Sequence, residues 1–222
     1  MYRKRGKRGK TMQMIGSDFD GTIVQRKTIS TKTREQIEAF RKRGNQFVIV
    51  SGRTVAKMKE GLKKYEADFY DAIIACNGAA ILDGNLNWIE EQTMDEETVK
   101  MLLRDLAAYA PVADGGRAVS FALQDGQGMP ILPDNVQAFR NGPYVDVVKR
   151  GVSKAAALRK LTGRYEVERL FTIGDGLNDI PLLDCAKDSY SFAHCPDEVK
   201  AHAHTIHTKI EDVLEDILHI QS

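Results

Sequence analysis

The sequence predicts an α/β protein whose core is a doubly wound parallel sheet, with a small α+β cap domain inserted into that core. Three observations indicate this class. Short apolar strands alternate with amphipathic helices in the first and last parts of the chain. The middle part shows a hairpin signal and a mixed pattern, and 222 residues suit one domain that carries an insert.

The first part of the chain supplies three strands and two helices of the core. The expected elements are strands at 12–17, 47–50 and 72–75 and helices at 33–43 and 55–64. The first helix carries Ile37 and Phe40 on its inner face and ends before Gly44, because glycine is favoured just after a helix. Strands separated by helices pair in parallel, since each helix returns the chain to the same end of the sheet.

The pattern changes after the third strand. Short strands at 79–82 and 86–89 flank Asp83-Gly84-Asn85, a sequence typical of a hairpin turn. Asp95 suits the N-cap of a helix, because its carboxylate can accept a backbone N–H of the first turn. That helix has one apolar face, made of Val99, Leu102, Leu103 and Leu106. Strands at 119–123 and 144–148, with a loop at 125–135 between them, complete an expected α+β cap, or lid, at residues 83–148.

The alternating pattern then returns and completes a Rossmann-like core, which we expect to comprise residues 12–82 and 149–222. The expected elements are helices at 154–161 and 180–186, strands at 169–173 and 189–193, and a final helix from about 210. Pro181 falls in the first turn of its helix, where proline is tolerated. The final helix repeats apolar residues every three or four positions, so it should pack on the core.

Charge and cysteine content exclude several classes of protein. Six of the 32 basic residues lie within residues 1–10, and the remaining 26 basic and 31 acidic residues give the rest of the chain a net charge of −5. We therefore expect a disordered basic tail at 1–11, and no nucleic-acid-binding surface beyond it. No apolar run is long enough to span a membrane. The three scattered cysteines argue against a disulfide framework and against a thiolate zinc site, which favours a reducing cytoplasm.

Carboxylates follow two strands that could be neighbours. If the strands ending at Ser17 and Ile173 lie side by side, four acids converge: Asp18, Asp20, Asp175 and Asp179. Their mutual repulsion would be relieved by a divalent cation, and a ligand set of oxygens favours Mg²⁺. The alternative is that these residues only cap turns and helices. That suits Asp179 before the helix at 180–186, but it explains two acids at the end of an apolar strand poorly.

Lys154 and Ser51 indicate an anion site nearby. Ser153 resembles an N-cap, which puts Lys154 in the first turn of its helix, where a cation is disfavoured unless an anion is bound. Ser51 and the neighbouring Gly52 also precede a helix, so a hydroxyl and backbone N–H groups are available there. A surface lysine without function is the alternative for Lys154. Arg53 and Asn77 are further candidates to reach a substrate.

Four motifs occur in the order found in one enzyme superfamily: DFDGTI at 18–23, SGR at 51–53, GVSK at 151–154 and GDGLND at 174–179. With them the chain resembles the haloacid dehalogenase superfamily over residues 12–220. CNGAAI at 76–81 is similar to the segment that enters the lid in its Cof-like sugar-phosphatase branch. In that branch the lid is inserted between the second and third motifs.

The resemblance implies a Mg²⁺-dependent phosphatase with an aspartyl-phosphate intermediate. Asp18 would be the nucleophile and Asp20 the general acid and base. The phosphate would be bound by Ser51, Gly52, Lys154 and Asn178. The metal site would consist of Asp18, Asp20 through its backbone carbonyl, Asp175 and Asp179.

The substrate implied is a small phosphoester, either a sugar phosphate or a phosphoglycolate-like acid, because the lid is short for this branch. A monomer or a homodimer is expected. Two alternatives stay open: a phosphomutase, and a non-catalytic sensor of a phosphorylated ligand.

Overall fold

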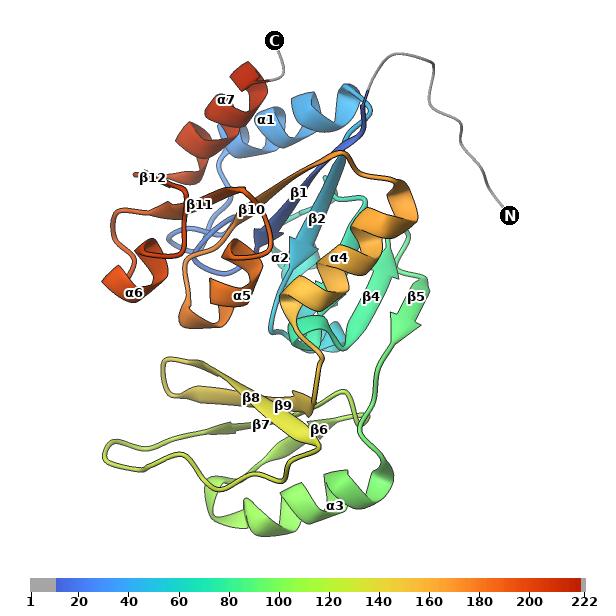
Figure 1. Cartoon of the computed structure of the whole chain (residues 1–222), viewed down its shortest axis with the longest axis vertical. Coiled ribbons are helices and arrows are strands. Elements are labelled where there is room, and N and C mark those ends of the chain that lie inside the picture. Colours follow the sequence, from blue (N-terminus) through green and yellow to red (C-terminus); the bar gives the residue numbers. More distant parts are fainter. Residues whose placement is uncertain (1–10, 221–222) are drawn as a thin grey trace.

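An eight-stranded sheet forms the core of the computed structural model, which describes residues 11–220 (Figure 1). In spatial order its strands are β12 (Thr205–His207), β11 (Asp188–Phe192), β10 (Arg169–Ile173), β1 (Gln13–Asp18), β2 (Gln46–Val50), β3 (Ala72–Ala75), β4 (Ala80–Asp83) and β5 (Trp88–Glu91). The six strands from β12 to β3 are parallel, and β4 and β5 add an antiparallel hairpin at the edge.

Helices cover both faces of this sheet. On one face lie α1 (Thr31–Lys42), α2 (Val55–Lys64), the short α6 (Asp197–Lys200) and α7 (Ile210–Ile220), and on the other lie α4 (Lys154–Tyr165) and α5 (Ile180–Leu183). Successive strand residues serve opposite faces, so Ile15 packs with the first group and Met14 with the second. The predicted fold class, a doubly wound parallel sheet, is confirmed.

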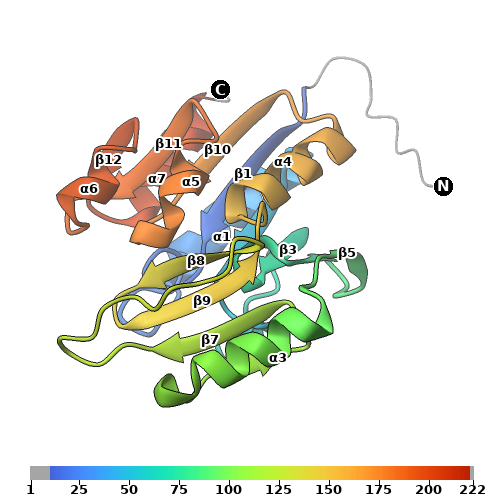
Figure 2. The same ribbon diagram turned by 60° about the horizontal axis from the view of Figure 1, so that its bottom comes forward.

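A smaller antiparallel sheet lies beyond the carboxyl ends of the core strands (Figures 1 and 2). Its strands in spatial order are β6 (Val112–Asp114), β7 (Ala118–Ala122), β9 (Tyr144–Lys149) and β8 (Val136–Asn141). Helix α3 (Glu96–Asp105) packs against this sheet, and Asp95 caps it as predicted, with its carboxylate accepting the Thr98 N–H at 2.8 Å. We call this part, with α3, the lid.

Several elements differ from the sequence expectation. Strands β6 and β12 have three residues each, and β8 has one fully buried residue, so all three lack a clear alternating pattern. The expected helix at 180–186 ends at Leu183, because Cys185 and Ala186 bond to carbonyls three residues back and tighten the last turn. A short 3₁₀ turn, η3 (Leu177–Asp179), precedes it.

The expected boundary of the lid at residue 83 is refined by the strand pairing. Strand β5 hydrogen-bonds to β4, so residues 88–91 extend the core sheet. We propose the division into core and lid with the crossing placed after β5. The predicted basic tail at 1–11 lies outside the described residues, apart from Thr11. Within residues 11–220, every helix falls short of the length and apolar character that a bilayer span requires.

Candidate active site

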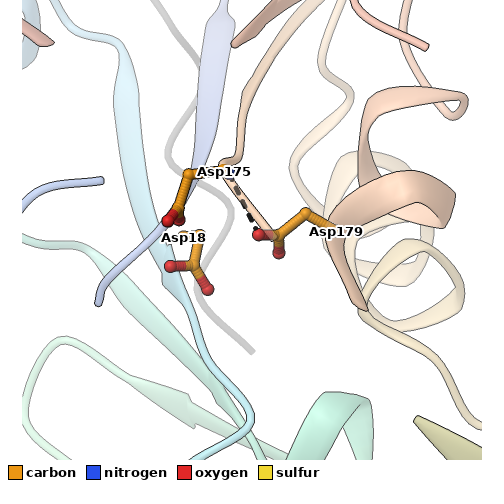
Figure 3. A group of neighbouring side chains, drawn as sticks. All are labelled: Asp18, Asp175 and Asp179. Atoms are coloured by element: carbon orange, nitrogen blue, oxygen red, sulfur yellow. Dashed lines mark hydrogen bonds between the residues drawn. The ribbon is translucent and has the colours of Figure 1, made fainter. Parts of the chain in front are cut away.

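The carboxyl ends of the central strands carry the predicted acids. Asp18 ends β1, and Ser17 lies opposite Ile173 of β10, so Asp175 emerges beside it (Figure 3). Asp179 comes from η3, directly after this loop. Asp18, Asp175 and Asp179 each offer an oxygen, and these atoms lie within 4.8 Å of one another. Three of the four acids predicted to converge therefore do so, although Asp18 and Asp175 lie more than 150 positions apart in the chain. We call Asp18, Asp175 and Asp179 the acidic cluster.

Lys154 lies inside this group of acids. It is buried in the first turn of α4, where the Ser153 hydroxyl accepts the Ala156 N–H at 3.0 Å as the predicted N-cap. Its Nζ donates to Asp18 Oδ1 at 2.5 Å and to Asp179 Oδ1 at 2.6 Å. Burial alone would lower the pKa of Lys154, but the charges of Asp179 and Asp18 outweigh burial and raise it. The lysine therefore stays charged.

Even with Lys154, the site holds more negative than positive charge. Burial, and then the charge of Asp179, raise the pKa of Asp18 well above its ordinary value, against the opposing effect of Lys154. The pKa of Asp175 is raised to about 6, mainly by burial and by Asp179. A divalent cation would remove this repulsion, and three carboxylate oxygens are the donors that Mg²⁺ prefers. The residues present therefore fit a magnesium ion.

Local hydrogen bonds fix the acidic cluster. The Thr22 hydroxyl donates to Asp175 Oδ1 at 2.8 Å. Asp179 Oδ2 accepts the N–H groups of Asp175 at 3.2 Å and Gly176 at 2.9 Å. Its side chain makes no capping bond to α5, but the bond from Gly176 caps the 3₁₀ turn η3, so the turn-and-cap alternative holds for Asp179 in part. Glycine is required at position 21, next to Asp175. Gly21 has a φ of +83°, and a Cβ built on it would stand 2.1 Å from Asp175 Oδ2.

Asp20 lies apart from the acidic cluster. Its two carboxylate oxygens accept from Arg53 Nε and Nη2, both at 2.6 Å, a bidentate pair. The guanidinium of Arg53 also lies 5.3 Å from the centre of the Phe19 ring. The Asp20 carboxylate is thus not among the three converging oxygens, and only its backbone carbonyl stays available as the expected metal ligand.

The predicted phosphate-binding residues surround the same strand ends. Ser51 is buried, and its hydroxyl accepts the Arg53 N–H at 3.1 Å. Gly52 follows it and is partly buried. Asn178 is buried in η3, and its Oδ1 is without a hydrogen-bond partner within the described residues. A buried acceptor without a donor costs free energy, unless a ligand or a water molecule donates a hydrogen bond to it.

The lid contributes residues that sequence reasoning missed. Asp146 of β9 accepts from Asn77 Nδ2 at 2.9 Å and from the Ser120 hydroxyl at 2.6 Å. Asp146 is an ordinary polar position in an alternating strand, so nothing in its sequence context distinguished it. Thr22 could have been noticed, because it belongs to the first motif.

Sheet, lid and acidic cluster together define an α/β enzyme with its site at the strand ends. The model of the haloacid dehalogenase-like hydrolase family matches residues 15–134 and 127–215. The chain belongs to this family.

Two curated relatives agree with this assignment. The 5-amino-6-(5-phospho-D-ribitylamino)uracil phosphatase YcsE of Bacillus subtilis is 26% identical, covering 90% of this chain and 92% of that protein. The phosphoglycolate phosphatase of Thermoplasma acidophilum is also 26% identical, covering 86% and 89%. The predicted enzyme class, a haloacid dehalogenase-like phosphatase, is confirmed.

Solved structures show the same fold. BT1666, a phosphatase of this superfamily from Bacteroides thetaiotaomicron, superimposes with a TM-score of 0.80 at 19% identity, over 99% of both chains. The subclass IIB sugar phosphatase BT4131 gives 0.79 at 18% identity, over 94% of this chain and 99% of that one. These structures show the fold of the Cof-like branch, and together with the family model and the curated relatives they confirm the predicted superfamily.

Proposed function

We propose that this protein is a Mg²⁺-dependent phosphatase that hydrolyses a small phosphorylated metabolite through an aspartyl-phosphate on Asp18. The observation that carries the proposal is the meeting of Asp18, Lys154, Asp175 and Asp179 at one edge of the sheet. A nucleophilic carboxylate, a fixed cation and an oxygen-rich metal site are what phosphoryl transfer requires.

Four residues would hold the metal: Asp18, Asp175, Asp179 and the backbone carbonyl of Asp20. When bound, Mg²⁺ supplies positive charge that offsets both the acids and the phosphate. Ser51, Gly52, Lys154 and Asn178 would hold the phosphoryl oxygens. The buried hydroxyl of Ser51 and the buried ammonium of Lys154 support this assignment.

The reaction divides into two displacements. A carboxylate oxygen of Asp18 attacks phosphorus, the bond from phosphorus to the ester oxygen breaks, and Asp20 gives its proton to the leaving oxygen. Water then loses a proton to Asp20 and attacks phosphorus, which breaks the bond to Asp18 and releases phosphate. Both aspartates return to their starting states. The position of Asp20, two residues after Asp18 in the same loop, supports its role, and its carboxylate is paired there with Arg53.

The test is phosphate release from a panel of phosphomonoesters with Mg²⁺. Asp18→Asn should lower kcat by at least about 10³-fold, because an amide cannot act as the nucleophile. EDTA should abolish turnover, and added Mg²⁺ should restore it. Asp125→Asn, in the lid loop, is the matched control and should keep wild-type kcat. Unchanged kcat in Asp18→Asn would refute the assignment, and an isomerised product without free phosphate would indicate a mutase.

We further propose a cytoplasmic location and a monomeric or homodimeric state. Cys76, Cys185 and Cys195 are free thiols, which supports a reducing compartment.

A further inference from the structure

The lid places one carboxylate against the loop of Ser51 and Gly52, which we propose to bind the phosphate. Asp146 of β9 lies opposite Ser120 of β7 in the sheet register, and Ser120 donates to its Oδ1 at 2.6 Å. Its Oδ2 accepts from Asn77 of the core at 2.9 Å. The same Oδ2 would stand 3.2 Å from a Cβ built on Gly52. The carboxylate is therefore fixed from both parts of the molecule, directly beside Gly52.

Asn77 adds a second acceptor at the same place. Its side chain is fully buried, and its Oδ1 is among the buried oxygens that find no partner within residues 11–220. A Cβ on Gly52 would lie 3.1 Å from Oδ1 and from Nδ2, so the amide faces this loop. The backbone of Asn77 is left-handed, with φ of 50°, and its N–H donates to the Ser51 carbonyl at 3.1 Å. Asparagine adopts this left-handed conformation more readily than other non-glycine residues, so it suits this position.

Both groups would complement a hydrogen-bond donor and oppose an anion. Each Asp146 oxygen accepts one bond here and can accept another, and Asn77 Oδ1 has its full capacity unused. Lys154 and Lys57 are the cations that act on Asp146, but Lys154 is engaged by the acidic cluster and Lys57 is exposed. A carboxylate on the substrate would meet like charge and two acceptors, whereas a hydroxyl would satisfy them.

We propose that Asp146, supported by Asn77, is a specificity-determining residue that selects phosphomonoesters with a hydroxyl close to the ester, as in polyol and sugar phosphates, and rejects those with a carboxylate there. This inference rests on the proposed phosphatase function, because it concerns the leaving group at the same site.

Two substrates of similar size test this inference. 2-Hydroxyethyl phosphate and phosphoglycolate differ only in a terminal hydroxymethyl or carboxylate group. The wild-type enzyme should favour the hydroxyl compound in kcat/KM by at least about 10-fold. Asp146→Asn should reduce this ratio about 10- to 100-fold, because the amide no longer repels the carboxylate and can donate to it.

Two variants support the comparison. Ser120→Ala, which keeps Asp146 but removes its lid donor, should reduce the ratio by a smaller factor. Asp125→Asn, which changes a lid carboxylate in the exposed 125–135 loop, should keep the wild-type ratio. Circular dichroism should show that all the variants are folded. A wild-type preference for phosphoglycolate, or a ratio in Asp146→Asn within twofold of wild type, would overturn the inference.

The generic substrate p-nitrophenyl phosphate separates this outcome from failure of the proposed function. If the wild-type protein with Mg²⁺ releases phosphate from no ester in the panel, including this one, the phosphatase proposal fails. If it hydrolyses esters but Asp146→Asn leaves the ratio unchanged, only the role of Asp146 fails.

Discussion

At the scale of single residues, the acidic cluster carries more negative charge than the buried Lys154 can balance. The pKa values of Asp18 and Asp175 are both raised, because burial and neighbouring carboxylates disfavour their ionised forms. Ionisation of these residues therefore destabilises the metal-free fold. Natural proteins retain such arrangements at functional sites, where the same charges bind a cation or act on a substrate.

Asp175 yields a pH prediction for the metal-free protein. Its pKa is about 6 in the folded state against an ordinary value of 3.8, so the folded protein holds this proton more tightly than the unfolded chain does. Its contribution to stability is complete below about pH 4 and is lost as the pH rises to about 6, by about 2–3 kcal/mol. Asp175→Asn should remove that loss.

Urea unfolding in EDTA between pH 4 and pH 7 measures this effect. As the pH rises through this window, the free energy of unfolding of Asp175→Asn should increase relative to that of the wild-type protein. A difference that stays constant with pH would show that Asp175 titrates normally in the folded protein.

At the scale of elements, the position of Lys154 depends on how α4 begins. The 3₁₀ turn η1 (Cys76–Gly78), after β3, packs against this helix start. A Cβ on Gly78 would stand 2.3 Å from the Ser153 carbonyl oxygen, and its φ of +110° is one that L side chains rarely adopt. Glycine at this position thus allows η1 and the start of α4 to approach each other. This close contact determines where Lys154 lies relative to the strand ends.

Gly78→Ala should therefore destabilise the protein by about 2–4 kcal/mol and lower kcat, because the added methyl group must displace the start of α4. Urea unfolding and phosphate release measure the two effects. Gly163, on the exposed part of the same helix, has no atom within 4 Å of an added Cβ. Gly163→Ala should instead stabilise by about 0.5–1 kcal/mol and keep wild-type kcat. Equal effects of the two substitutions would contradict this account.

At the scale of the whole molecule, core and lid meet through polar contacts as well as packing. Asp146 binds Asn77, and the Cys76 thiol donates to Asp114 of the lid at 3.2 Å. Arg117 pairs with Asp114 at 3.0 Å and also with Glu91 of β5. These contacts hold the lid against the carboxyl ends of the core strands.

Mg²⁺ should stabilise the whole molecule. At a hundred times its Kd, a ligand specific to the folded state contributes about 2.7 kcal/mol. For a chain of this length that corresponds to a rise in Tm of about 5–10 °C. Differential scanning fluorimetry with Mg²⁺ and with EDTA measures the shift. Asp175→Asn should lose most of it, whereas a full shift in that variant would exclude Asp175 as a ligand.

The layers of the core and the composition of the acidic cluster could be predicted from the order of the residues. Alternating strands and helices are a local property, and helix α2 and strands β3 and β10 have the predicted bounds. Parallel pairing then places Asp18 and Asp175 together, because residues that follow neighbouring parallel strands emerge at the same edge. Lys154 could be foreseen for a local reason too, since a cation at a helix start needs a negative partner.

The residues that the lid contributes to the site became apparent from the three-dimensional arrangement alone. The approach of Asp146 to Gly52 depends on the register of β7 with β9 and on the path of the chain after β5. A short sequence pattern predicts neither the register nor this path. A polar residue in an alternating strand gives the same pattern whether its side chain faces solvent or a cleft. The pairing of Asp20 with Arg53, and the orphaned oxygen of Asn77, arise in the same way from segments distant in sequence. Local propensity fixes which elements form, but long-range packing fixes which side chains meet.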